Sequence, residues 1–171
     1  MKDKLLSPGG MLVMGCLMGI LSKLSDVGSH MGYLQIILSE MTSQMSLWIL
    51  IGVVISLFSR SRKLAMANIF LFCMGMLAAY YVTAGVTHSV YGWSFIKGWA
   101  VFACFSPVMA YLVTLTKEKG RLPLLIKIGV LAAYVGVDLL LFGGPQIFDI
   151  VLLLPLLYLL FVRKYANGRK I

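Results

Sequence analysis

Long apolar runs alternate with short polar segments along this chain, and the apolar runs have the length of membrane-crossing helices. We expect helices at about residues 8–27, 41–59, 64–86, 94–116, 122–142 and 146–162. An α-helix rises about 1.5 Å per residue, so about 20 residues cross the roughly 30 Å core of a bilayer. The pattern predicts an all-α polytopic membrane helix bundle with six transmembrane helices, and residues 1–171 are expected to form a single integral membrane domain.

Polar residues and glycines mark the ends of the first apolar run, and the segment of residues 28–44 differs from the other runs. Ser7 followed by Pro8 is typical of a helix N-terminus, and Gly28 predicts the end of that helix. Residues 28–44 are mixed in character, with apolar side chains on one helical face and polar ones elsewhere. This mixture predicts a short interfacial or re-entrant helix after helix one.

Composition supports the same class of protein. Hydrophobic residues make up 60% of the chain and charged residues 12%, and the mean hydropathy is +0.94. A soluble domain of 171 residues could not bury that much apolar surface in one core, whereas a bilayer solvates it on the outside of a bundle. The formal charge of +9 would suggest nucleic acid in a soluble protein. Here the basic residues cluster between apolar runs, so no nucleic-acid partner is expected and the partner is the lipid bilayer.

The distribution of charge predicts the orientation in the membrane. A cytoplasmic N-terminus places both basic loops and the basic tail on the cytoplasmic side, together with every basic residue except Lys23 and Lys97. This bias is the one that membrane proteins show, so we expect an N-in, C-in topology. Four of the six acidic residues then fall on the outer side: Asp26, Glu40, Asp138 and Asp149.

Five outer charges come from four different predicted helices. Lys23 and Asp26 lie three residues apart and therefore share one helical face. Lys97, Asp138 and Asp149 fall in the outer third of their own spans. Charged side chains are costly within a bilayer and should face one another or water. They are either ordinary helix-end charges that touch lipid headgroups and form structural ion pairs, or the ligand-binding groups of an outward-facing pocket.

The pocket interpretation includes aromatic walls and a cover. Tyr80, Tyr81, Trp93 and Trp99 are expected at the same outer level, and residues 28–44 would form a lid. Pockets between helices commonly combine an apolar lining with a few convergent polar groups.

Motifs for metal, disulfide or catalytic chemistry are not evident. Cys16, Cys73 and Cys104 lie inside apolar runs without CxxC or Cys/His spacing, so they are expected to be small buried side chains. His30 and His88 belong to no HExxH motif, and the chain has no GxSxG motif. We therefore expect no enzyme activity, no catalytic residue, no metal and no cofactor.

Gly15 and Gly19 form a GxxxG pair on the first predicted helix. Small residues at this spacing let a second helix approach closely. The second helix could belong to this chain or to a partner membrane subunit.

Two resemblances extend the picture. The segments Ser22–Asp26, Leu57–Ser61 and Asn68–Phe72, with Gly75 and Tyr80-Tyr81, resemble a family of small, uncharacterised multi-pass membrane proteins of Gram-positive bacteria. That resemblance would cover most of the chain, and it implies a bacterial plasma membrane but no activity.

The second resemblance is one of architecture only. The chain is similar to the substrate-binding S components of energy-coupling-factor vitamin transporters in its length, its six expected spans, its cytoplasmic N-terminus and the small residues on helix one. In that family an AxxxA pattern meets the coupling subunit, and Gly15 and Gly19 would be its nearest counterparts. Glycines replace the alanines here, and no vitamin-specific motif is present, so no substrate is carried over.

Two functions remain open from the sequence. The first is a non-enzymatic membrane protein that binds or transports a small solute through the outward-facing pocket. The alternative is a structural or accessory subunit that packs with a partner membrane protein through Gly15 and Gly19.

Overall fold

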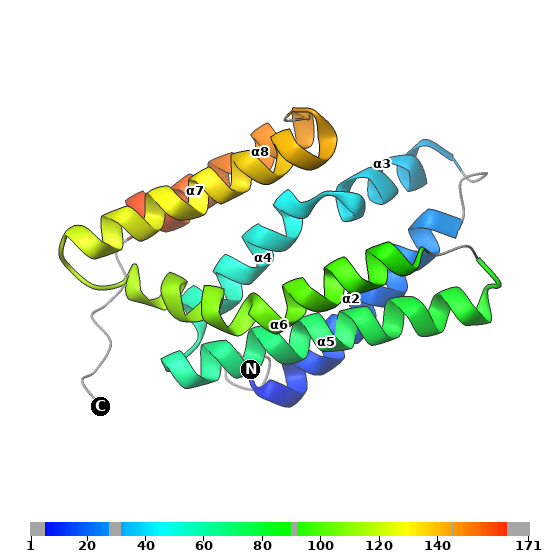
Figure 1. Ribbon diagram of the computed structural model, residues 1–171, viewed down its shortest axis with the longest axis horizontal. Helices are drawn as coiled ribbons and strands as arrows, with labels where there is room; N and C mark the ends of the chain where they lie inside the picture. The colour runs from blue at the N-terminus through cyan, green and yellow to red at the C-terminus, as the bar shows by residue number, and fades with distance from the viewer. Residues whose placement is uncertain (1–5, 28–31, 90–91, 145, 164–171) are drawn as a thin grey trace.

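The computed structural model describes residues 6–27, 32–89, 92–144 and 146–163, and of residues 34–36, 94, 95, 138, 141 and 142 it describes the backbone alone. Every regular element in these ranges is a helix (Figure 1). The helices are α2 (Pro8–Val27), α3 (Gly32–Ser43), α4 (Met45–Phe58), α5 (Arg62–Val86), α6 (Trp93–Leu115), α7 (Arg121–Phe142) and α8 (Ile147–Leu157), which continues as a π-helical segment (Tyr158–Val162). The all-α prediction is confirmed.

The lengths and apolar character of the helices are those of a membrane protein. Among the described residues, α2, α5 and the Ile96–Leu115 part of α6 are long and apolar enough to cross a bilayer, and the bent pair formed by α3 and α4 would make a fourth span. Ile147–Val162 is a shorter apolar helix. A helix occupies each of the six predicted runs, and three to four of them meet the criteria for a span.

The start of the first helix follows its sequence signal. α2 begins at Pro8, and the Ser7 hydroxyl oxygen accepts a hydrogen bond from the Gly10 backbone N–H at 3.1 Å. A side chain at this position satisfies one of the N–H groups that a helix leaves without a partner. The predicted span 8–27 is therefore that of α2.

The prediction of one continuous helix over residues 41–59 is wrong. The chain breaks at Gln44, whose backbone is extended (φ −86°, ψ 140°), and the helices on either side are bent by 66°. At the break the Gln44 side-chain amide donates a 2.6 Å hydrogen bond to the Gln146 side chain, which ties the bend to the segment before α8. A contact between residues so distant in sequence is not visible in local periodicity.

Basic segments from several helices gather at one end of the molecule, on the left in Figure 1. Arg62 at the start of α5 forms an ion pair with Glu118, which follows α6. The Lys117 ammonium donates to the Ser59 carbonyl oxygen at 3.3 Å, and burial lowers the pKa of Lys117. Arg163 lies at the same end, with its guanidinium over the ring of Phe58. The loops before α5 and after α6 thus meet at a basic end.

Asn68 ties the start of α2 to the same end. Its side-chain amide donates to the Leu6 carbonyl oxygen at 2.8 Å and to the Ser59 hydroxyl at 3.1 Å. The residue is fully buried. Asn68 therefore holds neighbouring segments of the chain together.

The closest helix crossing in the described structure joins α2 and α5. A Cβ atom added at Gly15 would lie 2.2 Å from the Phe72 carbonyl oxygen, and one at Gly19 would lie 2.3 Å from the Met76 carbonyl oxygen. Gly75 makes the reciprocal approach from α5, with its Cβ position 2.6 Å from the Leu12 carbonyl oxygen. The packing role predicted for Gly15 and Gly19 is thus filled by α5 of this chain, so these glycines are not accessible to a partner subunit.

The α7 and α8 helices form a second packed region with α4. Tyr134, Leu156 and Leu160 are almost completely buried there, against Val53 and Leu57 of α4. Figure 1 shows α7 and α8 side by side and apart from the α2–α5 pair, with α4 between the two groups. The molecule is thus a tight glycine-based pair, with α6 packed on α5, joined through α4 and α6 to the α7–α8 hairpin.

Candidate functional site

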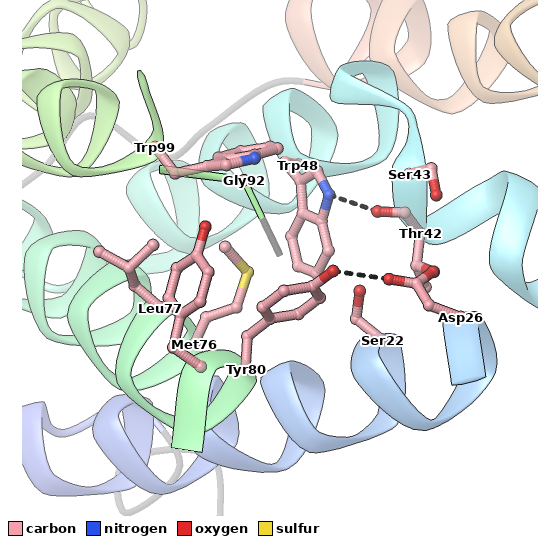
Figure 2. A pocket seen from close by; sticks show the side chains of 11 residues that line it. Ser22, Asp26, Thr42, Ser43, Trp48, Met76, Leu77, Tyr80, Gly92 and Trp99 are labelled. Carbon is pink, nitrogen blue, oxygen red and sulfur yellow. Dashed lines mark hydrogen bonds between the residues drawn. The ribbon is translucent and has the colours of Figure 1, made fainter. Parts of the chain in front are cut away.

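A pocket of about 320 Å³ lies at the end of the molecule opposite the basic segments (Figure 2). Five helices and the residue that precedes α6 form it, so its wall combines parts of the chain that are far apart in sequence. The lining residues are Ser22, Asp26, Thr42, Ser43, Trp48, Met76, Leu77, Tyr80, Tyr81, Gly92 and Trp99.

Asp26 is the acidic residue of this wall, and two hydroxyl groups hold it in place. The Tyr80 hydroxyl donates to Oδ2 at 2.7 Å, as Figure 2 shows, and the Ser39 hydroxyl donates to Oδ1 at 3.2 Å. The three residues come from α2, α5 and α3. Because each carboxylate oxygen can accept more than one hydrogen bond, Asp26 keeps acceptor capacity for a ligand.

Lys23 lies one turn before Asp26 but is not among the lining residues. Its side chain is 4% exposed, and its ammonium nitrogen lies 5.0 Å from the centre of the Tyr80 ring. This is a cation–π contact, in which the ring face attracts the positive charge. Lys23 therefore supports Tyr80 from outside the described wall, and Tyr80 in turn orients Asp26.

Four aromatic side chains surround the space. The Tyr80 and Tyr81 rings lie edge to face, with their centres 5.2 Å apart. The Trp48 indole N–H donates to the Thr42 carbonyl oxygen at 2.9 Å, which fixes the ring at the bend between α3 and α4. Trp99 completes the wall from α6 (Figure 2). These rings present rigid apolar surface next to a carboxylate.

Trp93, which was predicted for this wall, is 70% exposed and is not among the lining residues. It is the first residue of α6 and directly follows the wall residue Gly92. Two wall residues identified by the structure, Thr42 and Ser43, belong to the segment that was predicted to cover the pocket.

Asp149 lies in a different polar cluster. It is 2% exposed, and one carboxylate oxygen accepts a hydrogen bond from the Ser46 hydroxyl while the other accepts one from the Gln146 backbone N–H at 2.7 Å. The Tyr134 hydroxyl donates to the Asp149 carbonyl oxygen at 2.8 Å. Asp149 thus caps α8 and joins it to α4 and α7, and it takes no part in the pocket.

The remaining two predicted residues are Lys97 and Asp138. Lys97 is exposed on α6 and is absent from the pocket wall, while the side chain of Asp138 lies outside the described residues. Of the five outer charges, the structure brings Lys23 and Asp26 together around Tyr80. It places Lys97 and Asp149 elsewhere.

The cysteines match the sequence expectation in part. Cys73 is buried and Cys16 is half-buried, but Cys104 is exposed. The prediction of a buried side chain is wrong for Cys104 because it lies next to Phe105 on the outward face of α6, where Phe105 is 59% exposed. Within the described ranges, no group of three His, Cys, Asp or Glu residues could hold a metal ion.

The structure also identifies wall residues that the sequence did not single out. Ser22 lies one helical turn before Asp26, so its position on the same face was readable from the spacing. Trp48 was not readable in this way, because its position depends on the bend at Gln44.

Comparisons of the chain with protein-family models, with curated proteins and with solved structures find no match. The site is therefore interpreted from its own geometry and chemistry.

Proposed function

We propose that this chain is a non-enzymatic plasma-membrane protein that binds a small organic cation in the pocket around Asp26 and acts in its uptake or sensing. The observation that carries the proposal is an oriented carboxylate beside four aromatic rings in a space of about 320 Å³. Aromatic faces attract ammonium groups, and a carboxylate adds a charge of opposite sign.

The composition of the wall supports a cationic ligand. Among its lining residues, Asp26 is charged and none is basic, while Ser22, Thr42 and Ser43 add hydroxyl groups. The Asp26 oxygens accept hydrogen bonds from Tyr80 and Ser39 and present negative charge to the cavity. An ammonium group fits this arrangement better than a carboxylate or a phosphate would.

The distribution of charge over the bundle supports one orientation in the membrane. We propose six spans with both termini in the cytoplasm, in which the α3–α4 pair forms the second span. The gathering of basic segments at one end of the helices supports this topology. Asp26 and Tyr80 of the pocket lie near the C-terminal ends of α2 and α5, whereas Arg62 lies at the start of α5. In this topology the pocket would open to the outside.

The experiment that tests the proposal is a choline titration of the full chain in lipid nanodiscs, followed by tryptophan fluorescence. A Trp93→Phe background removes the exposed indole, so the signal comes from Trp48 and Trp99 in the wall. We expect a saturable change in fluorescence. Asp26→Asn should weaken choline binding at least about tenfold, because the charge that pairs with the ammonium is lost.

Glu40→Gln provides the matched control. Glu40 is an exposed acid on α3 and is not among the lining residues. Its substitution removes the same charge near the pocket without changing the wall. Equal choline binding by wild type, Asp26→Asn and Glu40→Gln, or no binding by any of them, would refute the proposal.

A further inference from the structure

A second, larger cavity of about 460 Å³ adjoins the pocket and lies between α4, α5, α6 and α7. We call it the apolar chamber. Trp48, Met76 and Trp99 belong to the walls of both cavities. The polar pocket and the apolar chamber therefore meet at these three side chains.

Small residues on facing helices leave the space of the chamber open. Gly52 of α4, Ala110 of α6, and Gly129 and Ala133 of α7 all lie in its wall. A Cβ atom added at Gly129 would meet no atom within 4 Å, and one at Gly52 would meet only the end of the Ile69 side chain at 3.5 Å. Side chains of ordinary size at these positions would fill part of the chamber.

The chamber offers apolar contacts and almost no hydrogen bonds. Its two serine hydroxyls are used locally, since Ser56 donates to the Gly52 carbonyl oxygen and Ser106 to the Ala103 carbonyl oxygen, each at 2.7 Å. Methionine, aliphatic and aromatic side chains make up most of the remaining wall. Hydrocarbon is the chemistry that suits such a surface.

The chamber is also accessible from the side of the bundle. Met109 of α6 is 56% exposed and Leu112 is 37% exposed, although both line the chamber. Gly129 on α7 is exposed as well. In a bilayer these residues would face lipid, so a hydrocarbon chain could enter without crossing water.

From these observations we infer that the ligand of the pocket is a single-chain amphiphile. Its cationic head lies against Asp26 and Tyr80, and its hydrocarbon chain passes Trp48 and Trp99 into the chamber. A water-soluble cation would leave the chamber empty, and a plain hydrocarbon would leave the Asp26 carboxylate unused. An engineered cavity of about 150 Å³ holds one benzene molecule, so the chamber has room for one chain rather than a bulky two-chain lipid.

This inference rests on the proposed function and adds a hydrocarbon chain to the cationic head group of the proposed ligand. It is tested in the Trp93→Phe background, in nanodiscs of unbrominated phosphatidylcholine. The probe is hexadecyltrimethylammonium with bromine on the carbons next to its head group, added at low mole fraction. Bromine quenches indole fluorescence on contact. We expect saturable quenching of Trp48 and Trp99 that excess unbrominated probe reverses.

Variants that fill the chamber test binding of the hydrocarbon chain separately from binding of the head group. Ala133→Phe and Gly129→Leu add bulk at the chamber wall. Ala132→Phe places the same ring on a neighbouring residue that is exposed like Ala133 but is not in the wall. We expect the two filling variants to weaken binding of the hexadecyl probe at least about tenfold and to leave choline binding unchanged. Ala132→Phe should behave as wild type, and Asp26→Asn should weaken both ligands.

Each outcome distinguishes the two proposals. If the wild type binds choline but the filling variants bind the hexadecyl probe as tightly as the wild type does, the inference of a hydrocarbon chain in the chamber is overturned. The proposed function would stand. Quenching that rises linearly with the mole fraction of probe, as for bulk lipid, would also overturn the inference. Photocrosslinking from position 133 to a polypeptide would show that a partner helix occupies the chamber. Absence of choline binding in the wild type would instead refute the proposed function.

Discussion

Two polar regions of the bundle use an aspartate in opposite ways. Asp26 lies on the tightly packed α2–α5 pair, is half-buried and faces a cavity. Asp149 lies on the α7–α8 hairpin, is almost fully buried and bonds to Ser46 and the Gln146 backbone. In the α2–α5 pair, glycines supply the contact between the helices and Asp26 remains accessible. In the α7–α8 hairpin, Asp149 itself helps to hold the helices together.

The largest expected effect comes from the glycine crossing that supports the Asp26 region. Gly19→Ala places a Cβ atom 2.3 Å from the Met76 carbonyl oxygen, so α2 and α5 must separate. We expect a loss of more than about 3 kcal/mol in the free energy of unfolding, measured in mixed micelles by titration with sodium dodecyl sulfate.

Gly9→Ala is the control for this crossing. The same Cβ at Gly9 would meet nothing within 4 Å, so the alanine should be neutral or stabilise α2 by up to about 1 kcal/mol. Equal stability of the two variants would show that the crossing does not support the pair.

A smaller loss is expected for Asp149→Ala. The substitution leaves the buried Ser46 hydroxyl and the Gln146 N–H without their acceptor, which should cost about 2–3 kcal/mol in the free energy of unfolding. Asp26→Ala should cost about 1–2 kcal/mol, because it removes the hydrogen bonds from Tyr80 and Ser39 to a half-buried carboxylate, and it should abolish choline binding. If the two alanine variants lost stability and binding to the same extent, the contrast between the regions would disappear.

Two tyrosines permit a matched comparison with a smaller effect. Tyr80→Phe removes the hydrogen bond to Asp26, and Tyr134→Phe removes the one to the Asp149 carbonyl oxygen. Each should cost about 1 kcal/mol in the free energy of unfolding. Fluorescence titration should show weaker choline binding for Tyr80→Phe, by about threefold to tenfold, and no change for Tyr134→Phe. A change in binding in Tyr134→Phe alone would assign the ligand to the other region.

The smallest effect is expected for Lys97→Ala. Lys97 is exposed and lies outside the pocket wall, so the free energy of unfolding should change by less than about 0.5 kcal/mol. Choline affinity should stay within twofold of wild type. A large loss of binding would bring Lys97 back into the site, as the sequence pattern suggested.

The helices were predictable where their signals are local. Ser7 and Pro8 mark the start of α2, and the hydrogen bond from the Gly10 N–H to Ser7 supplies the physical reason. The bend at Gln44 was not predictable, because the hydrogen-bond partner of its side chain is Gln146, 102 residues further along the sequence. Local periodicity contains no information about such a contact.

The candidate site was predictable only in part. Spacing along α2 placed Lys23 and Asp26 on one face, and the outer position of Tyr80 and Trp99 followed from the length of the spans. The exposure of Lys97 and Trp93 depends on the rotation of α6 about its axis. In a chain so apolar throughout, the sequence contains little that distinguishes a lipid-facing side of α6 from an inner one. The cap made by Asp149 is local, because its carboxylate accepts from the Gln146 backbone N–H three residues earlier. Its contact with Ser46 crosses the bundle and is not visible in the sequence.

The hydrogen bond between the Trp48 indole and the Thr42 carbonyl oxygen has a consequence for the shape of a ligand. Thr42 lies in the last turn of α3, where carbonyl oxygens have no partner within the helix, and the indole supplies one. Swinging the ring aside would leave a buried acceptor unpaired, at a cost of about 1–3 kcal/mol. Trp48 is therefore a fixed partition between the pocket and the chamber, and a bound molecule must thread past it instead of displacing it. Selection by cross-section follows, so a straight, slender chain should pass where a branched one would stop.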